Sequence, residues 1–371
     1  MQHLKLAQSP NIRPDPRWGL NHQRGMTLIE WMVSMTIGLI LMAGLTTLIA
    51  QQSSTQAELE KSSRQIENGR YAMQLLNDDI QLAGYYGEFS NVSTATPAST
   101  DACSIGLALL EGLMAFPVQG YDSPASGLST CVASANHVSG TDILVVRRVE
   151  PSTLTIAAAA AGAGGRVYLQ SGLTPSGSEF EKRLATGATT AVFDLQTQAK
   201  PGFAAAPAPL RNFLVHIYFV SPCSVPVPVG SNCSSAADGG KPIPTLKMIE
   251  LSASGAITTL VTTPLVEGIE NMQVDYGIDT TGDGSPDGQF IATSTDWPNL
   301  MALRIHLLAR SNESTVGYLD SKTYTMGFDS GGAAQTVTPS VDSYSNNVRS
   351  YKRRLFSQLI RIVNPSSRRD G

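Results

Sequence analysis

The chain has 371 residues and a formal net charge of −4, with 15% charged and 42% hydrophobic residues. A mildly acidic, moderately apolar chain lacks the basic surplus of a protein that binds nucleic acid by charge. Its length allows one large domain or two small ones, and its apolar content is sufficient for a hydrophobic core.

The N-terminal part begins with a polar, basic leader and continues into an uncharged apolar run. Residues 1–25 carry more Lys and Arg than Asp and Glu, and residues 31–50 carry no charge. As a helix, this run would be about 30 Å long, which matches the hydrocarbon core of a bilayer. A buried core helix and a secretory signal peptide are the alternatives, but the run is long and no small-x-small cleavage site follows it. The basic leader predicts a cytoplasmic N-terminus, with the rest of the chain exported.

Glu30 stands at the start of the apolar run, five positions after Gly25. Insertion scales put an acidic residue at the centre of a membrane helix at about 2.5–3.5 kcal/mol, so a carboxylate there calls for a partner. A cut after Gly25 would create a new α-amino group on Met26, four residues before Glu30. That amine, on the same or a neighbouring chain, is a natural counter-charge.

The segment RGMTLIE, residues 24–30, and the apolar run behind it resemble the class III signal of type IV prepilins and type II secretion pseudopilins. The resemblance implies that a membrane peptidase cuts between Gly25 and Met26 and N-methylates Met26. It also implies that Glu30 supports docking of subunits in a filament. Met26 departs from the phenylalanine that is commonest at this position in the family. The implied segments are a leader, residues 1–25, and the transmembrane half of the N-terminal helix, residues 26–50.

Residues 51–85 are predicted to continue this helix as an amphipathic half. Residues that are apolar or small recur at heptad spacing and form one stripe: Leu59, Ile66, Met73 and Ile80, with Gly69, Leu76 and Ala83 between them. Gly84, Gly87 and the Ser/Thr/Pro-rich residues 90–101 predict the end of the helix. Such a stripe suits a helix that packs on a sheet of its own chain.

The remaining residues, 86–371, predict a β-rich globular head. β-Branched or alternating segments predict strands over residues 141–149, 213–220, 246–251, 256–261, 271–278, 302–310 and 351–363. The Ala/Gly tract 157–165 and residues 200–209 are predicted to be loops. One long helix followed by several strands predicts an α+β fold with an antiparallel sheet, which is similar to the pilin fold.

Four cysteines fall in the part that the leader predicts to be exported, where disulfides persist: Cys103, Cys131, Cys223 and Cys233. Four cysteines allow three pairings, and we expect the sequence-local one, Cys103–Cys131 and Cys223–Cys233. Each bridge would stabilise the fold by about 3 kcal/mol in the chain-entropy model. No pair has the CxxC spacing of a zinc or redox site.

Residues 279–287 (DTTGDGSPD) resemble the first part of an EF-hand-like calcium loop. Oxygen-bearing side chains fall at alternate positions, Asp279, Thr281, Asp283, Ser285 and Asp287, and glycine stands at the sixth position. However, Thr281 stands where Asp or Asn is usual, and Phe290 takes the place of the bidentate glutamate. The sequence therefore leaves two interpretations, a weak calcium site and an Asp/Gly-rich β-turn.

Two C-terminal segments, residues 265–279 and 352–357, are similar to the matching regions of PilW-type minor pilins. With the chain length, they imply a minor pilin of a type IV pilus that helps to prime assembly at the tip. The implied partners are prepilin peptidase, other minor pilins, the major pilin, the assembly platform in the inner membrane and a tip adhesin. The implied location is the inner membrane, with the head in the periplasm, and then the pilus tip. The alternatives are a minor pseudopilin of type II secretion and a static, single-pass membrane-anchored adhesin.

Motifs of common enzymes do not occur in the sequence, which has no HExxH, GxSxG or GxxxxGK[ST] pattern. His216 and His306 fall inside predicted strands and are expected to be core or sheet-face residues. A C-terminal basic cluster is expected to form a solvated strand face, and DNA contact is disfavoured: Arg349, Lys352, Arg353, Arg354, Arg361, Arg368 and Arg369. We therefore expect an assembly protein and not an enzyme, with calcium as the one candidate cofactor.

Overall fold

The computed structural model describes residues 25–367 apart from residues 90–98, 126, 129, 163–164, 178, 199–204 and 226–230. The predicted leader, residues 1–25, lies outside this part except for Gly25. The chain forms two compact units, Met1–Ala57 and Glu58–Gly371.

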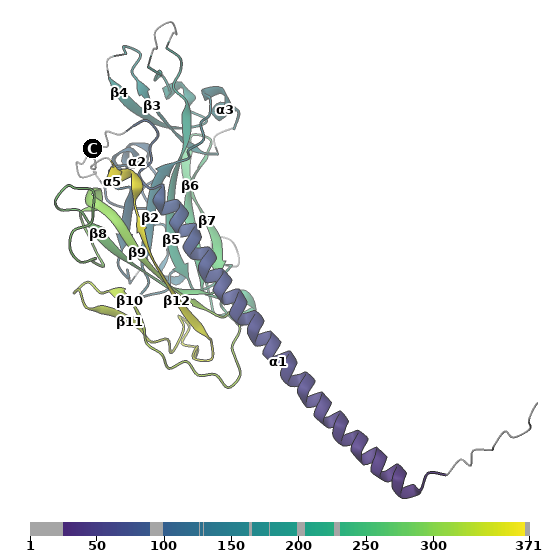
Figure 1. Cartoon of the computed structure of the whole chain (residues 1–371). Coiled ribbons are helices and arrows are strands. Elements are labelled where there is room, and N and C mark those ends of the chain that lie inside the picture. The colour runs from purple at the N-terminus through teal and green to yellow at the C-terminus, as the bar shows by residue number, and fades with distance from the viewer. Residues whose placement is uncertain are drawn as a thin grey trace, which may run out of the picture. The chain divides into compact units, whose positions relative to one another are not determined.

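One long helix, α1 (Leu28–Gln81), begins in the first unit and ends in the second (Figure 1). Its first part is uncharged from Trp31 to Ala50, as a membrane helix requires, and its second part mixes charged residues with an apolar stripe. The other α-helices are short: α2 (Leu107–Leu113), α3 (Ile156–Ala161), α4 (Ala237–Gly240) and α5 (Val363–Ser367). Single 3-10 turns cover Ser134–Asn136, Thr190–Val192 and Trp297–Asn299.

The head is built from antiparallel strands in three sheets. The largest has seven strands in the order β1-β2-β5-β3-β4, and β6 and β7 continue it from β5. A three-stranded sheet has the order β12-β9-β8, and β10 pairs with β11. The strands are β1 (Val118–Tyr121), β2 (Ile143–Val149), β3 (Val167–Leu173), β4 (Phe180–Thr186), β5 (Leu210–Ser221), β6 (Thr245–Ser254), β7 (Ile257–Glu267), β8 (Ile269–Ile278), β9 (Leu300–Arg310), β10 (Tyr324–Phe328), β11 (Ala334–Val337) and β12 (Arg353–Arg361). The predicted α+β class with an antiparallel sheet is confirmed.

The seven-stranded sheet is covered on both faces at its central strands, β2 and β5, which are buried at almost every position. One face of β2 and β5, with Leu144 and Val220, joins a core that also contains residues of α1 and of the three-stranded sheet. The other face, with Val145 and Phe219, packs under α2 and the chain after α1. Since successive strand residues point to opposite faces, the mostly apolar segment of β5 over residues 213–220, which only His216 interrupts, reflects burial on both sides.

The buried face of α1 differs in part from the predicted stripe. Gly69, Met73, Leu76, Ile80 and Ala83 are buried as expected, but the Leu59 side chain is 66% exposed. The prediction also missed three buried positions seven residues apart, Gln65, Ala72 and Asp79. Two of these are polar, and a pattern of apolar residues alone does not find polar groups that are buried with hydrogen-bond partners.

Every strand predicted from the sequence is present, with bounds shifted by a few residues. The β3–β4 and β10–β11 pairs were missed; Figure 1 shows them at opposite ends of the head. The prediction of a loop over residues 157–165 was wrong for its first part, because α3 covers Ile156–Ala161. The Thr155 side chain accepts a hydrogen bond from the backbone N–H of Ala158 and caps this helix, whose alanines are strong helix formers. The predicted loop 200–209 lies partly outside the described residues.

Candidate functional site

The predicted cleavage site lies immediately before α1. Residues 25–27 are not helical, and Trp31 donates the first helical hydrogen bond to the carbonyl of Thr27, at 3.2 Å. The backbone N–H of Glu30 donates to Thr27 Oγ1 at 3.4 Å, so Thr27 caps the helix N-terminus. Because the Gly25–Met26 peptide bond precedes this cap, it lies outside the helical hydrogen-bond ladder, and both residues are exposed.

Glu30 lies in the first turn of α1, where the helix dipole favours a negative charge. The Thr27-x-x-Glu30 spacing is that of a capping box, a signal that the sequence analysis did not use. The Glu30 side chain is exposed, and it takes part in none of the ion pairs found among residues 25–367 where these are described. The carboxylate is therefore exposed at a defined position in the first turn of the helix.

The surface of α1 from Trp31 to Ile49 is largely apolar and open. The side chains of Trp31, Ile40 and Ile49 are 61%, 71% and 65% exposed, and the segment qualifies as a candidate membrane span by length and composition. Its hydroxyls are satisfied inside the helix: Thr36, Thr46 and Thr47 donate to carbonyls three residues earlier, at 2.8–2.9 Å. A helix in lipid needs this self-sufficiency, because hydrocarbon offers no hydrogen-bond partners.

The second part of α1 is fixed to the seven-stranded sheet by one buried carboxylate. Asp79 accepts hydrogen bonds from Arg148 Nε at 2.6 Å, from His216 Nδ1 at 2.8 Å and from the Tyr218 hydroxyl at 2.8 Å. These three partners lie on β2 and β5. Burial acts to raise the pKa of Asp79, but His216 and Arg148, through their charges and hydrogen bonds, lower it below its ordinary value of 3.8.

We expect Asp79→Ala to lower the free energy of unfolding by about 3–5 kcal/mol, because it leaves Arg148, His216 and Tyr218 without their shared partner. A carboxylate with a lowered pKa in the folded state stabilises fully above the unfolded-state pKa, and this stabilisation is lost as the pH falls below about 4. Urea denaturation of the full-length protein in detergent between pH 3 and 7 measures both effects. Asp79→Asn, which keeps the volume and loses the charge, is the control and should cost less. An alanine variant with the stability of the wild type, and with the same loss of stability at low pH, would contradict this role of Asp79.

Two further polar contacts hold α1 against the C-terminal strands. The buried Gln65 amide donates to the carbonyls of Ala309 and Lys352, at 2.7 and 3.0 Å. Glu58 pairs with the Lys352 ammonium at 2.7 Å and accepts from the Thr315 hydroxyl at 2.8 Å. The hydrogen bond from Lys352, aided by Thr315, lowers the pKa of Glu58 to about 2. This half of α1 is therefore held by specific polar contacts as well as by its apolar stripe.

Both disulfides join the cysteines that the sequence-local pairing predicts. Cys103 is bonded to Cys131 and Cys223 to Cys233, with no free cysteine among the described residues. The first bridge ties the chain before α2 to the segment that leads into β2. The second closes a short loop between β5 and β6. Both lie in unit 2, and they constrain the unfolded chain more than the folded one.

The calcium interpretation of residues 279–287 is not supported. In the described residues, no group of three or more His, Cys, Asp or Glu side chains is placed to hold a metal ion. Instead, Asp279 accepts from the backbone N–H groups of Gly282 and Gly284 at 2.6 and 2.9 Å, and Asp287 accepts from that of Thr280 at 2.7 Å. The carboxylates thus close an Asp/Gly-rich turn, because they satisfy the backbone of their own loop.

The expectation that the C-terminal basic cluster is a solvated face is wrong for Arg353. Its side chain is fully buried and forms ion pairs with Glu270 and, at 3.2 Å, with Asp320. The alternation of charges along β12 did not reveal this, because both acidic partners lie on other segments. Arg368 and Arg369 lie outside the described residues.

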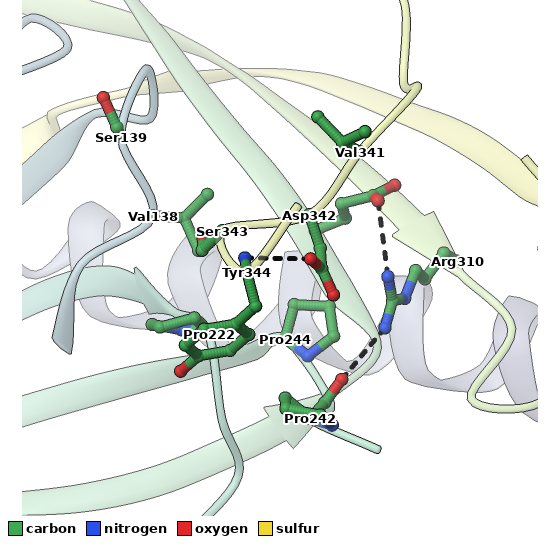
Figure 2. A pocket seen from close by; sticks show the side chains of 11 residues that line it. Val138, Ser139, Pro222, Pro242, Pro244, Arg310, Val341, Asp342, Ser343 and Tyr344 are labelled. Atoms are coloured by element: carbon green, nitrogen blue, oxygen red, sulfur yellow. Dashed lines mark hydrogen bonds and ion pairs between the residues drawn. The ribbon is translucent and has the colours of Figure 1, made fainter. Parts of the chain in front are cut away.

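A pocket of about 240 Å³ lies between the end of β9 and the residues around Tyr344, and is walled by Pro222, Pro242 and Pro244 (Figure 2). The charged groups that line this pocket form hydrogen bonds or ion pairs within the chain. Arg310 donates to the Pro242 carbonyl at 3.1 Å and lies 3.6 Å from Glu270. Asp342 accepts from the Tyr344 backbone N–H at 2.9 Å. Arg310 and Asp342 therefore have partners within the head.

Strand register brings Ser357, His306 and Asp275 together on one face of the three-stranded sheet. His306 Nδ1 lies 2.7 Å from Ser357 Oγ, and His306 Nε2 lies 3.3 Å from Asp275 Oδ2. The buried carboxylate also accepts from the Phe328 backbone N–H at 3.0 Å. These contacts link all three strands to β10, and His306 is a sheet-face residue as predicted. Sequence reasoning missed the trio because its members are far apart in the chain.

Two family models match the chain. The model described as Type IV Pilus-assembly protein W matches residues 231–364, which include β6 to β12. The model described as prokaryotic N-terminal methylation motif matches residues 20–46, which include Gly25, Met26 and Glu30. No curated protein and no solved structure gives a significant match.

The two matches fall on the two regions that carried the resemblance in the sequence. The first covers the C-terminal strands of the head, and the second covers the start of α1 with its exposed apolar surface. Together with the α+β fold, they show that this chain is a type IV pilin-like pilus-assembly protein whose C-terminal part is similar to the pilus-assembly protein W family.

Proposed function

We propose that the chain is a minor pilin of a type IV pilus, which prepilin peptidase cuts after Gly25 and which helps to prime pilus assembly at the tip. The observation that carries the proposal is the position of Glu30, in the first turn of an exposed apolar helix that follows a non-helical Gly25–Met26 bond. A static membrane anchor has no use for a carboxylate at this point, where lipid disfavours it. The similarity to a pilus-assembly family favours a pilus over a type II secretion system.

In this mechanism the function is assembly and not catalysis. After the cut, Met26 carries a free α-amine that the peptidase methylates, and the amine and Glu30 bear opposite charges. In the low dielectric of the bilayer and of the filament core, each of these charges is unfavourable alone and is stabilised by the other. Because α1 rises 1.5 Å per residue, pairing between adjacent subunits would also fix their axial register.

The remaining roles follow from the membrane segment. Before assembly, the apolar part of α1 holds the subunit in the inner membrane, and the disulfide-containing head lies in the periplasm. The assembly platform then extracts α1 from the membrane into a bundle with the helices of other minor pilins and of the major pilin. The polar contacts of Asp79, Gln65 and Glu58 keep the second part of α1 on the head during this transfer.

Sheared pili test this proposal. We expect the processed chain in the sheared pilus fraction of cells that carry its pilus genes, and we expect most pili to be lost when the gene is deleted. Secretion by the type II pathway is the matched readout: its loss with normal pili would instead indicate a pseudopilin. Two results together would refute the minor-pilin role: a full-length, uncut chain that stays in the membrane fraction, and normal pili in cells that lack the gene.

A further inference from the structure

Strand β7 is an edge of the seven-stranded sheet along its whole length. It pairs with β6 from Ile257 to Glu267 and with no other strand among the residues that the structure describes. Within the described part of the chain, the backbone of residues 257–266 makes no hydrogen bond outside the β6 ladder. Pro264 lies inside the strand, and proline is tolerated in sheets mainly where its missing N–H faces away from the ladder.

The register of the hairpin identifies which backbone groups face the free edge. The two-residue turn Gly255–Ala256, with Gly255 at a φ of +62°, makes Ser254 and Ile257 the closing hydrogen-bonded pair. Pairs then alternate, so Thr258, Leu260 and Thr262 turn their N–H and C=O groups outward. Pro264 has the same orientation but offers no donor, so it ends the stretch that can pair.

The other edges of the head are short, charged or covered. Strands β1 and β11 have four residues each. Strand β4 carries Glu181, Lys182 and Arg183, and β12 carries Arg354 and Arg361, which are charges that discourage edge pairing. The outer edge of β8 is occupied, since Met272 accepts from Asp142 N–H at 2.9 Å and Tyr276 exchanges backbone hydrogen bonds with Ile291.

Strand β7 is covered only near its start, where Thr258 is buried and its hydroxyl donates to the carbonyl of Ile105 at 2.7 Å. Its residues 257–266 (ITTLVTTPLV) are uncharged, and the Ile257 and Val261 side chains are 70% and 49% exposed. A long, uncharged edge with exposed β-branched side chains is what soluble proteins avoid unless another chain covers it.

We propose that β7 receives a β-strand of a neighbouring pilus subunit, which extends the seven-stranded sheet across the subunit contact. Main-chain donors and acceptors in a row along a sheet edge are complementary to the extended backbone of another strand. The partner strand is uncharged over five to seven residues, because a charged side chain laid against Ile257 or Val261 would be buried without a partner. This inference rests on the proposed function, which places other pilins beside this head.

Photo-crosslinking in cells that make the pilus tests the contact directly. The probe is benzoyl-phenylalanine, introduced into the full-length protein at Val261 or, as the matched control, at Leu359 on the charged edge strand β12, where the side chain is 58% exposed. We expect position 261 to crosslink to a protein that carries the same N-terminal methylation motif, and position 359 to give little of this product. Crosslinks to such a protein that are equal at both positions, or absent at 261, would overturn the proposal.

A pair of variants tests whether the contact uses the main chain. Thr262→Pro removes an outward N–H, and Thr262→Val keeps it with a side chain of similar shape. With one outward donor lost, we expect Thr262→Pro to reduce the crosslink at position 261 on the order of fivefold or more, and Thr262→Val to leave it unchanged. Val261→Lys adds a charge to the edge and leaves the β6 ladder intact. With benzoyl-phenylalanine placed at Thr259 instead, this variant should also reduce the crosslink. It tests the contact if the proline variant does not fold.

The processed N-terminus separates failure of this proposal from failure of the proposed function. If the β7 variants are cut, form their disulfides and enter pili with unchanged crosslinks, the edge contact is wrong and the minor-pilin role stands. If the wild-type chain is not cut and does not enter pili, the proposed function itself is wrong.

Discussion

Glu30→Ala is expected to remain inserted in the membrane and to be cut after Gly25, yet to be lost from sheared pili. Removing the carboxylate makes insertion easier, because lipid disfavours the charge. In the filament, however, the α-amine of Met26 then has no counter-charge. Truncating one partner of a buried charge pair costs about 2–5 kcal/mol, so incorporation should fall by at least tenfold. Quantitative immunoblots of membrane and sheared fractions measure this ratio.

Two controls separate charge from local helix effects. Glu30→Gln keeps the size and the hydrogen-bonding capacity, so it should behave like the alanine variant if the charge is what matters. Ser34→Ala removes a hydroxyl that donates to the Glu30 carbonyl, one turn earlier in the helix. This variant should enter pili normally. Normal incorporation of Glu30→Ala would rule out the pairing of Glu30 with the terminal amine.

Gly25→Val is expected to leave the precursor uncut, so that the full leader stays attached and pili lack the subunit. In the structure, a Cβ at position 25 would meet no atom within 4 Å, so the substitution does not disturb the described fold. Any block must therefore arise at the peptidase, which would have to accept a branched side chain next to the scissile bond. The mass of the protein isolated from membranes reports the cut.

Gly38→Val is the matched control for this substitution. Gly38 also has open space around its Cβ position, and it lies in α1, beyond the cleavage site. A β-branched residue there alters helix propensity by less than about 1 kcal/mol and leaves the Gly25–Met26 bond unchanged. We expect Gly38→Val to be cut like the wild type. Cutting of Gly25→Val at the wild-type rate would contradict the assignment of the cleavage site.

Much of the fold was predictable because its signals are local. The uncharged run of α1 and the alternating polar and apolar residues of β8 and β9 each predict their structure from ten to twenty consecutive residues. The β3–β4 hairpin was not predictable in this way, since β4 carries three consecutive charged residues and therefore lacks the alternating pattern of a strand. Its partners, β3 and Glu111 of α2, are known only from the structure.

The buried polar groups mark the limit of sequence reasoning. Asp79 and Arg353 are charged residues in segments with exposed charged neighbours, so their composition predicts exposure. Each is buried because partners from distant strands satisfy it: Arg148 and His216 for Asp79, and Glu270 for Arg353. Such pairs depend on topology, which a single sequence does not reveal. By contrast, the roles of Gly25, Met26 and Glu30 rest on local sequence and remain predictions for experiment.

The mass spectrum of the mature N-terminus tests the central claim most directly. In cells with an active prepilin peptidase, we predict a chain that begins at N-methylated Met26, with Glu30 as its fifth residue. A chain that retains Met1 and the whole leader in those cells would contradict both the processing and the assembly role that depends on it.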